Sequence, residues 1–253
     1  MPDIENKALI VGAGPAGLSG AAALKKHGVA FELHERHRSV GGLWDIDNPG
    51  SPMYRSAHFI SSKYLSHLAG LPMPDDYPDY PSNRQLLAYI RSFAKENALE
   101  DHITLNSEIV RAEKAAGGWR VTFGNGEEKG YRWLLTAVGT NWHPYMPEFE
   151  GSFSGRLMHS REYHSADELK GKRVLVVGAG NSGCDIACDA ARAADKALIS
   201  MRRGYHFIPK HVFGVPADVF AAQGPHMPAW LSQRVFGLIL RLLLGDLTKL
   251  GLP

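Results

Sequence analysis

The stretch ALIVGAGPAG, residues 8–17, decides the fold, and VLVVGAGNSG, residues 174–183, repeats it. Each copy places a G-x-G-x-x-G turn directly after four apolar residues and ahead of an alanine-rich stretch. The apolar runs predict buried parallel strands, and the stretches that follow predict helices. One such turn is a weak signal because it is short. Two in the same context predict two dinucleotide-binding units in an α/β fold.

The glycines of each turn have separate physical roles. The first allows a tight turn, the second lets the backbone approach a pyrophosphate, and the third lets the helix pack closely on the strand. The helix N-terminus then presents unpaired N–H groups and a partial positive charge to the phosphates. We therefore expect cofactor contacts from Gly12, Gly14, Pro15, Ala16 and Gly17 in the first turn, and from Gly178, Gly180, Asn181, Ser182 and Gly183 in the second.

The residues after each second strand distinguish the two units. Residues 30–34 lead into Glu35 and Arg36, and residues 197–201 lead into Arg202 and Arg203. A carboxylate at this place accepts hydrogen bonds from ribose hydroxyls and repels a 2′-phosphate. Guanidinium groups instead fit a 2′-phosphate. The first site, with Glu35 and Arg36 as expected cofactor contacts, therefore suits FAD, and the second, with Arg202 and Arg203, suits NADPH. The alternative for the pair Arg202 and Arg203 is a solvated surface pair.

Composition narrows the classes of function. The chain has 253 residues, enough for one large or two modest domains, and its net charge of +2 gives no field for nucleic acid. Its polar, acidic start is neither a signal nor a transit peptide. Cys184 and Cys188, the only cysteines, form no CxxC, so we expect buried thiols in a reducing cytoplasm. The 12 histidines have no metal-ligand spacing, and no metal is predicted.

The rest of the chain is organised around these units. Ser82 and Gln85 predict a capping box for a helix over 86–94. We further expect a loop over 47–81, a β-meander from 103–109, 119–123 and 131–138 with a hairpin turn at 124–126, and a linker over 139–147. The predicted fold is two Rossmann-like domains, 1–147 for FAD and 151–253 for NADPH, with the meander as an insertion. The apolar residues 235–244 are about half a membrane span; they predict a packed amphipathic helix, with membrane contact as the alternative.

Four motifs give the chain a family resemblance. FSGRLMHSREY at 153–163 matches FxGxxxHxxx(Y/F), and GGLW stands at 41–44. AVGT at 137–140 and GAGNSGCDIA at 178–187 complete the set. Together they resemble the flavin-containing monooxygenases over nearly the whole chain. Tyr163, rather than tryptophan, separates it from the Baeyer–Villiger branch.

The resemblance implies a mechanism and several site residues. NADPH reduces FAD, reduced flavin takes up O2 as a C4a-hydroperoxide, and a soft sulfur or nitrogen nucleophile of a small molecule removes the outer oxygen. Gly42, Leu43 and Trp44 would lie beside the flavin. His159, with Arg161 as neighbour, would help to shape the NADP site; the alternative is a hydrogen-bonded linker histidine.

Two departures from the family pattern shape the remaining expectations. Ile60 stands where the family has an asparagine over the flavin, and a hydrocarbon cannot donate a hydrogen bond. Ser61 or His58 would substitute, which makes Ser61 a cofactor contact and, with His159, a candidate catalytic residue. The family also continues with further strands, so we expect an incomplete second sheet with uncovered apolar surface, as in a piece of a longer enzyme.

Other functions stay open from the sequence alone. One is an FAD-dependent NADPH oxidase or reductase without oxygen transfer, and another is a catalytically inactive nucleotide-binding module. The identity of the substrate is not encoded in any recognisable motif. A homodimer is compatible with the sequence, and neither nucleic acid nor a transmembrane segment is expected.

Overall fold

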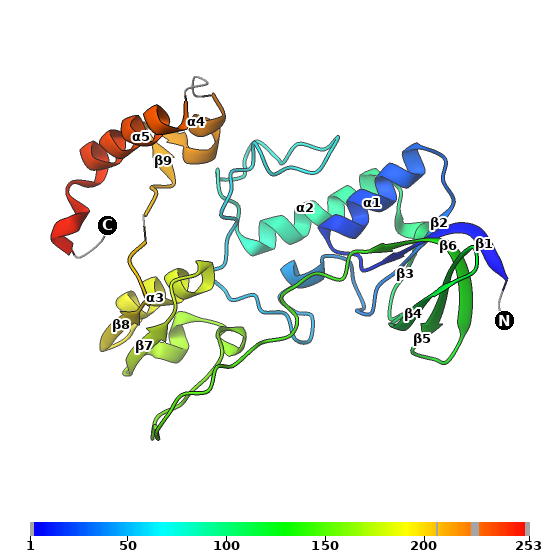
Figure 1. The fold of residues 1–253 in the computed structure, drawn as a ribbon, viewed down its shortest axis with the longest axis horizontal. Helices are drawn as coiled ribbons and strands as arrows, with labels where there is room; N and C mark the ends of the chain where they lie inside the picture. Colours follow the sequence, from blue (N-terminus) through cyan, green and yellow to red (C-terminus); the bar gives the residue numbers. More distant parts are fainter. Residues whose placement is uncertain (1–2, 206, 224–227, 251–253) are drawn as a thin grey trace.

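The computed structural model describes residues 3–205, 207–223 and 228–250, and it confirms the predicted α/β class. A six-stranded sheet has the order β3-β2-β1-β6-β5-β4. Its parallel part joins β3, β2, β1 and β6, and its antiparallel part joins β6, β5 and β4 (Figure 1). The strands are β1 Ile4–Val11, β2 Phe31–His34, β3 Ile103–Thr104, β4 Ile109–Ala115, β5 Gly118–Phe123 and β6 Glu128–Thr136.

Both faces of the central strand β1 are covered, by different elements. Ala8 and Ile10 point to the face where α1 (Pro15–Lys26) and α2 (Asn83–Glu96) pack. Leu9 points to the other face, where the meander contributes Val121 and Tyr131, all three fully buried. Successive side chains of β1 point to opposite faces, and both faces are buried here, so residues 8–11 form a continuous apolar run. The glycine turn at the end of β1 therefore has a rigid base.

Two local predictions are confirmed in detail. Ser82 Oγ accepts from the Gln85 backbone N–H at 3.4 Å, and Gln85 Oε1 accepts from the Ser82 N–H at 3.0 Å. This reciprocal pair begins α2. The predicted hairpin is also present as β5 and β6, and Gly126 N–H donates to the carbonyl of Phe123 in the turn between them.

The expected single strand over 103–109 is wrong. The chain instead forms β3, which pairs in parallel with β2, and begins β4 at Ile109. Asn106, at φ +52°, breaks the extended conformation between them. Asparagine tolerates this left-handed conformation better than most residues, so Asn106 is the residue at which the strand can break.

The second glycine turn lies in a separate, two-stranded parallel sheet of β7 (Arg173–Val177) and β8 (Lys196–Ser200), with α3 (Asn181–Ala193) between them in sequence. One sheet face packs on α3 through Val174, Val176 and Ala197. On the other face Leu175 and Leu198 are more than half exposed. The expected uncovered apolar surface is thus present. The division into an FAD domain over 1–147 and an NADPH domain over 151–253 stays a prediction.

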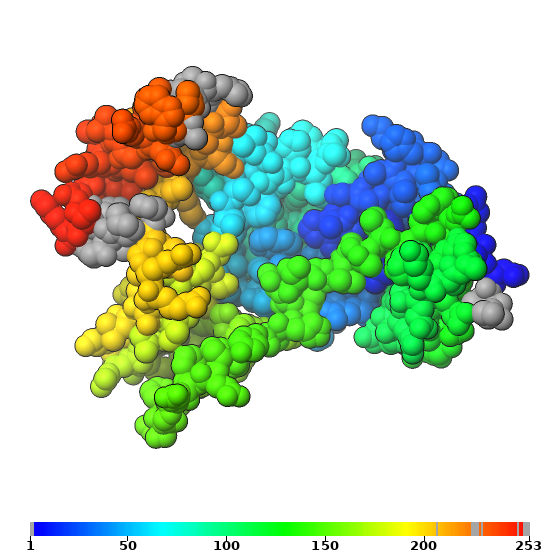
Figure 2. Space-filling view, in the orientation of Figure 1, coloured from blue at the N-terminus to red at the C-terminus, as the bar shows by residue number. Residues whose placement is uncertain are grey.

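The last part of the chain contains short elements and one longer helix. A hairpin of β9 (His211–Val212) and β10 (Val215–Pro216) leads into α4 (Ala217–Gln223), and α5 spans Ala229–Leu244. The predicted helix over 235–244 is confirmed as part of α5, but its expected packing is wrong, because Leu238 and Leu242 are 62% and 74% exposed. Figure 2 shows α5, in red, at one margin of the molecule. No helix in the described part of the chain is long and apolar enough to cross a membrane.

Candidate dinucleotide-binding sites

The first glycine turn connects β1 to α1 and has no room for a side chain at its first and third glycines. Gly12 has φ +103°, and a Cβ there would lie 2.6 Å from the carbonyl oxygen of Ala137. A Cβ on Gly17 would lie 1.8 Å from the carbonyl oxygen of Gly12. The helix begins at Pro15 with Gly14 as N-cap, no capping side chain and no acid in its first turn. This arrangement leaves the helix N-terminus suited to an anionic ligand.

Glu35 has a role here that the sequence did not reveal. Its carboxylate is buried, 4% exposed, and accepts hydrogen bonds from the backbone N–H groups of Ala13 (2.7 Å) and His37 (2.9 Å). It therefore fastens the glycine turn to the end of β2. Each carboxylate oxygen can accept more than one hydrogen bond, so a ribose hydroxyl would share these oxygens with the backbone donors. The ribose contact stays a prediction.

The GGLW segment lies against the first turn. Residues Gly42–Trp44 form a short 3-10 helix, and a Cβ on Gly42 would lie 3.0 Å from Cα of Gly14. The carbonyl of Leu43 accepts from Ser51 Oγ at 2.7 Å, and the ring of Trp44 meets that of Phe59 edge to face at 5.5 Å. The structure thus brings together two segments that the sequence assigned to FAD from independent motifs.

A cavity of about 330 Å³ opens beside the end of β2. The guanidinium of Arg36 lies 4.5 Å from the ring centroid of Trp142, and Arg161 Nη1 donates to the carbonyl of Trp142 at 2.6 Å. Two cations and an aromatic face are a favourable environment for a nucleotide. Trp142 was missed because it stands in the linker, where no motif points to it. The lining residues are Arg36, His37, Pro49, Glu108, Trp142, His143 and Arg161.

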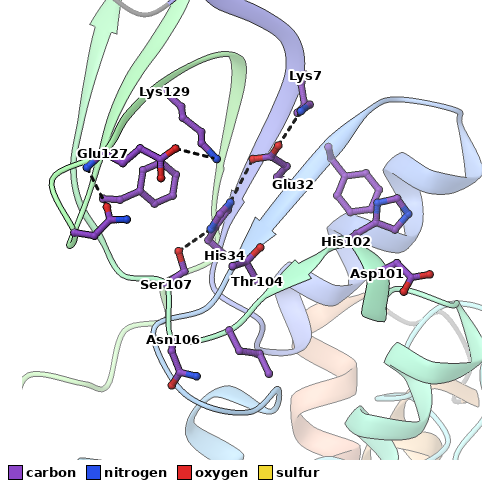
Figure 3. Close-up of a pocket in the computed structure, with 14 residues that line it drawn as sticks. Lys7, Glu32, His34, Asp101, His102, Thr104, Asn106, Ser107, Glu127 and Lys129 are labelled. Carbon is purple, nitrogen blue, oxygen red and sulfur yellow. Dashed lines mark hydrogen bonds and ion pairs between the residues drawn. The ribbon is translucent and has the colours of Figure 1, made fainter.

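The larger cavity, of about 590 Å³, lies elsewhere, on the side of β2 that faces the meander (Figure 3). There Glu32 accepts from Lys7 Nζ at 2.8 Å and from Tyr131 Oη at 2.6 Å, and His34 Nδ1 lies 2.8 Å from Ser107 Oγ. Burial pushes the pKa of Glu32 upward, but these hydrogen bonds outweigh burial and hold the pKa at about 2. Burial lowers the pKa of His34. Among the described residues lining this cavity, none is a predicted cofactor contact.

The second glycine turn repeats the geometry of the first. Gly178 has φ +102°, and a Cβ on Gly183 would lie 2.3 Å from the carbonyl oxygen of Gly178. Helix α3 begins after Gly180 with no capping side chain and no acid in its first turn. Among the described residues, no atom lies within 4 Å of a Cβ placed on Gly178 or Gly180, so this turn is open. The predicted contacts Asn181, Ser182 and Gly183 form the first turn of α3.

The arginine pair of the second unit is exposed. Arg202 and Arg203 follow directly after β8, and Gly178 N–H donates to the carbonyl of Ser200 at 2.9 Å, so strand end and turn are adjacent. Exposed guanidinium groups beside a helix N-terminus fit a 2′-phosphate together with a pyrophosphate. The residues present therefore suit NADPH, and the contact stays a prediction.

The two candidate catalytic residues are occupied by local hydrogen bonds. His159 Nδ1 accepts from the N–H of Arg161 at 3.1 Å and caps the 3-10 helix Ser160–Glu162. Ser61 Oγ accepts from Ser66 Oγ at 2.6 Å. The neighbouring Ile60 is 61% exposed. The capping hydrogen bond of His159 agrees with the alternative of a hydrogen-bonded linker histidine, and a part in chemistry stays a prediction for both residues.

The cysteines differ from the expectation. Cys184 is half-buried and Cys188 is exposed, so the predicted pair of buried thiols is wrong. Their spacing of four residues placed both on α3, but the apolar face of this short helix is narrow and Ile186 and Ala190 occupy it. Within the described ranges, no group of three or more His, Cys, Asp or Glu side chains is arranged to hold a metal.

The family model described as flavin-binding monooxygenase-like matches residues 5–232. The chain belongs to the flavin-binding monooxygenase-like family. This family is a class of oxidoreductases whose cofactors are FAD and NADPH. The predicted resemblance is confirmed.

Individual relatives of the family support the same placement. A probable indole-3-pyruvate monooxygenase of Arabidopsis thaliana, YUCCA9, is 34% identical over 254 residues, covering 98% of this chain and 59% of the relative. A double mutant of the flavin monooxygenase from Stenotrophomonas maltophilia superposes with a TM-score of 0.74 at 26% identity, over 94% of this chain and 69% of that one. The S-allyl-L-cysteine S-oxygenase from Allium sativum gives a TM-score of 0.71 at 25% identity, over 80% of this chain and 52% of that one. The chain thus spans about three-fifths of the length of the curated relative.

Proposed function

We propose that this chain binds FAD at the first glycine turn and NADPH at the second, and that the protein transfers one oxygen atom from O2 to a small molecule. The observation that carries the proposal is the matched pair of turns, with Gly12 at φ +103° and Gly178 at φ +102°. Each opens a helix whose N-terminus has neither an acid nor a capping side chain. Bound FAD supplies the chemistry that activates O2 once NADPH has delivered a hydride.

The roles of this chain's own residues follow from position. Residues 12–17 and 178–183 would hold the two pyrophosphates, and Glu35 would orient the ribose of FAD while fastening the turn. Gly42, Leu43 and Trp44 would exclude water on one side of the flavin. Arg202 and Arg203 would select the phosphorylated cofactor. The exposure of these side chains supports the roles proposed for them. Glu35 is 4% exposed and is held in place beside the first turn, whereas Arg202 and Arg203 are exposed and accessible to a phosphate.

The substrate is proposed to be a soft nucleophile, with sulfur or nitrogen as the oxygen acceptor. The S-oxygenase from Allium sativum, named for a thioether substrate, supports this assignment. The relative from Arabidopsis is instead named for indole-3-pyruvate, a 2-oxo acid. A substrate panel therefore has to contain a thioether, a tertiary amine and an aryl-substituted 2-oxo acid.

An NADPH oxidase without oxygen transfer is the second candidate, and Ile60 is the observation that favours it. The side chain at this place is a hydrocarbon that donates no hydrogen bond, and it is 61% exposed. The adjacent Ser61 hydroxyl already accepts from Ser66. Such a site would release reduced oxygen as peroxide rather than transfer it.

The deciding experiment supplies NADPH and ¹⁸O2 to the FAD-loaded chain with each member of the panel. We expect one ¹⁸O atom in a sulfoxide or N-oxide. Label in an oxidised product of the 2-oxo acid alone would replace the substrate class and keep the monooxygenase. Peroxide equal to the NADPH consumed, with no labelled product, would establish the oxidase. Failure to retain FAD at all would overturn both.

The cellular location and the oligomeric state of the protein are also part of the proposal. A reducing cytoplasm is supported by the two unpaired cysteines, Cys184 and Cys188. The homodimer stays a prediction, which sedimentation would test.

A further inference from the structure

A buried carboxylate, Asp189, joins three segments that are distant in the sequence. It lies on α3 and is 7% exposed. Its Oδ2 accepts hydrogen bonds from Ser56 Oγ at 2.5 Å and from Tyr163 Oη at 2.8 Å. Ser56 belongs to the loop that continues to Ser61, and Tyr163 ends the 153–163 motif. One oxygen atom therefore connects the helix of the second glycine turn to both.

Asp185, one helical turn earlier on the same face of α3, adds a second connection. Its Oδ2 accepts from Tyr54 Oη at 2.7 Å, and the rings of Tyr54 and Tyr163 lie 5.7 Å apart between centroids. Burial, reinforced by the neighbouring carboxylates, raises the pKa of both phenols. Both tyrosines therefore remain hydrogen-bond donors at neutral pH.

The other side of this loop is tied to the first unit. Asn83, at the start of α2, donates from Nδ2 to the carbonyl of Tyr54 at 2.8 Å and from its backbone N–H to the carbonyl of Ala57 at 3.0 Å. Two residues further on, Phe59 meets Trp44 of the GGLW segment. The loop is thus held between α3 on one side and the predicted flavin segment on the other.

Helix α3 packs tightly on its glycine turn, because a Cβ on Gly183 would lie 2.3 Å from the carbonyl oxygen of Gly178. A pyrophosphate bound at the N-terminus of α3 would therefore fix the position of Asp189, two turns along the helix. Charge-assisted hydrogen bonds to a buried carboxylate transmit such a constraint better than exposed contacts. The other carboxylate oxygen of Asp189, Oδ1, lies 3.6 Å from the exposed guanidinium of Arg192 on the same helix, so Oδ2 carries the connection to the two other segments.

We propose that Asp189 is a positioning residue that couples NADPH binding at the second glycine turn to the loop approaching the flavin. The proposal rests on the proposed function, since it requires both cofactors to bind. It states that bound NADPH restrains residues 57–63 through Asp189, Ser56 and Tyr163, so that binding of either cofactor favours binding of the other.

The test measures NADP⁺ affinity by calorimetry for the FAD-loaded and the FAD-free chain. For the unaltered chain we expect FAD to tighten NADP⁺ binding by about fivefold or more. Ser56→Ala combined with Tyr163→Phe removes both hydroxyls with little change in packing, and should bring this factor close to one. Tyr89→Phe is the matched control, because it removes a buried phenol hydroxyl bonded to the carbonyl of Leu71, away from α3.

The outcomes separate the proposal from the function on which it rests. An unchanged coupling factor in the double variant overturns the role of Asp189, as does a factor of one in the unaltered chain that binds both cofactors. Failure to bind NADP⁺ would overturn the proposed function instead. Should the double variant not fold, amide hydrogen exchange of the unaltered, FAD-loaded chain decides. Slower exchange of residues 57–63 on adding NADP⁺ supports the proposal, and unchanged exchange at saturation contradicts it.

Discussion

The two glycine turns of this molecule have the same internal geometry in different surroundings. In both, the first glycine has φ near +100° and the third packs on the carbonyl of the first. The first turn is enclosed by Ala137 and Gly42 at the centre of a six-stranded sheet. The second lies on two strands, and one face of those strands, with Leu175 and Leu198, is exposed.

The difference shows which properties belong to the motif and which to its surroundings. The motif creates a backbone site for a pyrophosphate in both places. The proposed choice of nucleotide would depend on neighbours of opposite character: a buried carboxylate that also holds the first turn together, and an exposed arginine pair beside the second. Under this proposal, we expect stability and nucleotide selectivity to be coupled in the first unit and separate in the second.

The largest expected effect comes from adding one methyl group to the third glycine of each turn. Gly17→Ala should destabilise the chain by about 3 kcal/mol and abolish FAD binding, because its Cβ would meet a backbone oxygen inside a packed sheet. Gly183→Ala makes the same clash in the open unit, so it should abolish NADP⁺ binding at a smaller loss of stability. Denaturant unfolding of both variants measures the contrast; equal losses would contradict it.

Next in size is the removal of the charge on Glu35. Glu35→Gln leaves one of the two backbone donors, Ala13 or His37, facing an amide NH2 group, and should cost about 2 kcal/mol together with most of the FAD affinity. Fluorescence-monitored unfolding and flavin titration give the two values. If the FAD affinity falls while the free energy of unfolding is unchanged, Glu35 acts on the ribose alone. Stability and FAD binding are then not coupled in the first unit.

The first unit should also be the one that fails in acid. The pKa of Glu32 is about 2 in the folded chain against 4.5 for a free side chain. Its stabilising contribution is therefore complete above pH 4.5 and is lost as the pH falls toward 2. After allowance for solvent screening it is about 1.5 kcal/mol.

Unfolding measured between pH 6 and 3 checks this contribution. Glu32→Gln should flatten the acid limb of the profile, whereas Glu113→Gln, which removes an exposed ion pair with Arg111, should leave it unchanged. If the free energy of unfolding falls equally with pH in both variants, groups other than Glu32 cause the acid sensitivity.

The smallest effect on stability is expected at the second unit's arginines. Replacing Arg202 and Arg203 together by alanine should change the free energy of unfolding by less than about 0.5 kcal/mol, because both are exposed. The same change should weaken NADP⁺ binding by about tenfold and leave NAD⁺ binding nearly unaffected. Parallel calorimetric titrations with the two nucleotides measure the ratio. If the affinities for NADP⁺ and NAD⁺ fall by the same factor, the two arginines do not bind the 2′-phosphate.

Local patterns predicted the parts of the fold that depend on neighbours in sequence. The capping box at Ser82, the hairpin turn at Gly126 and both glycine turns are of this kind. Strand β4 was missed because Ile109–Ala115 is mostly exposed and carries three charges, so burial leaves no periodic signal. Asp189 was missed because its partner Ser56 lies 133 residues away. Contacts of this kind arise only when separate segments meet.

The most direct test of two distinct sites is calorimetric titration of the purified chain with FAD and then with NADP⁺, followed by the reverse order. We predict one equivalent of each nucleotide bound at the same time, in either order. A single equivalent in total, with one nucleotide displacing the other, would contradict the assignment of Glu35 and the arginine pair to separate pockets.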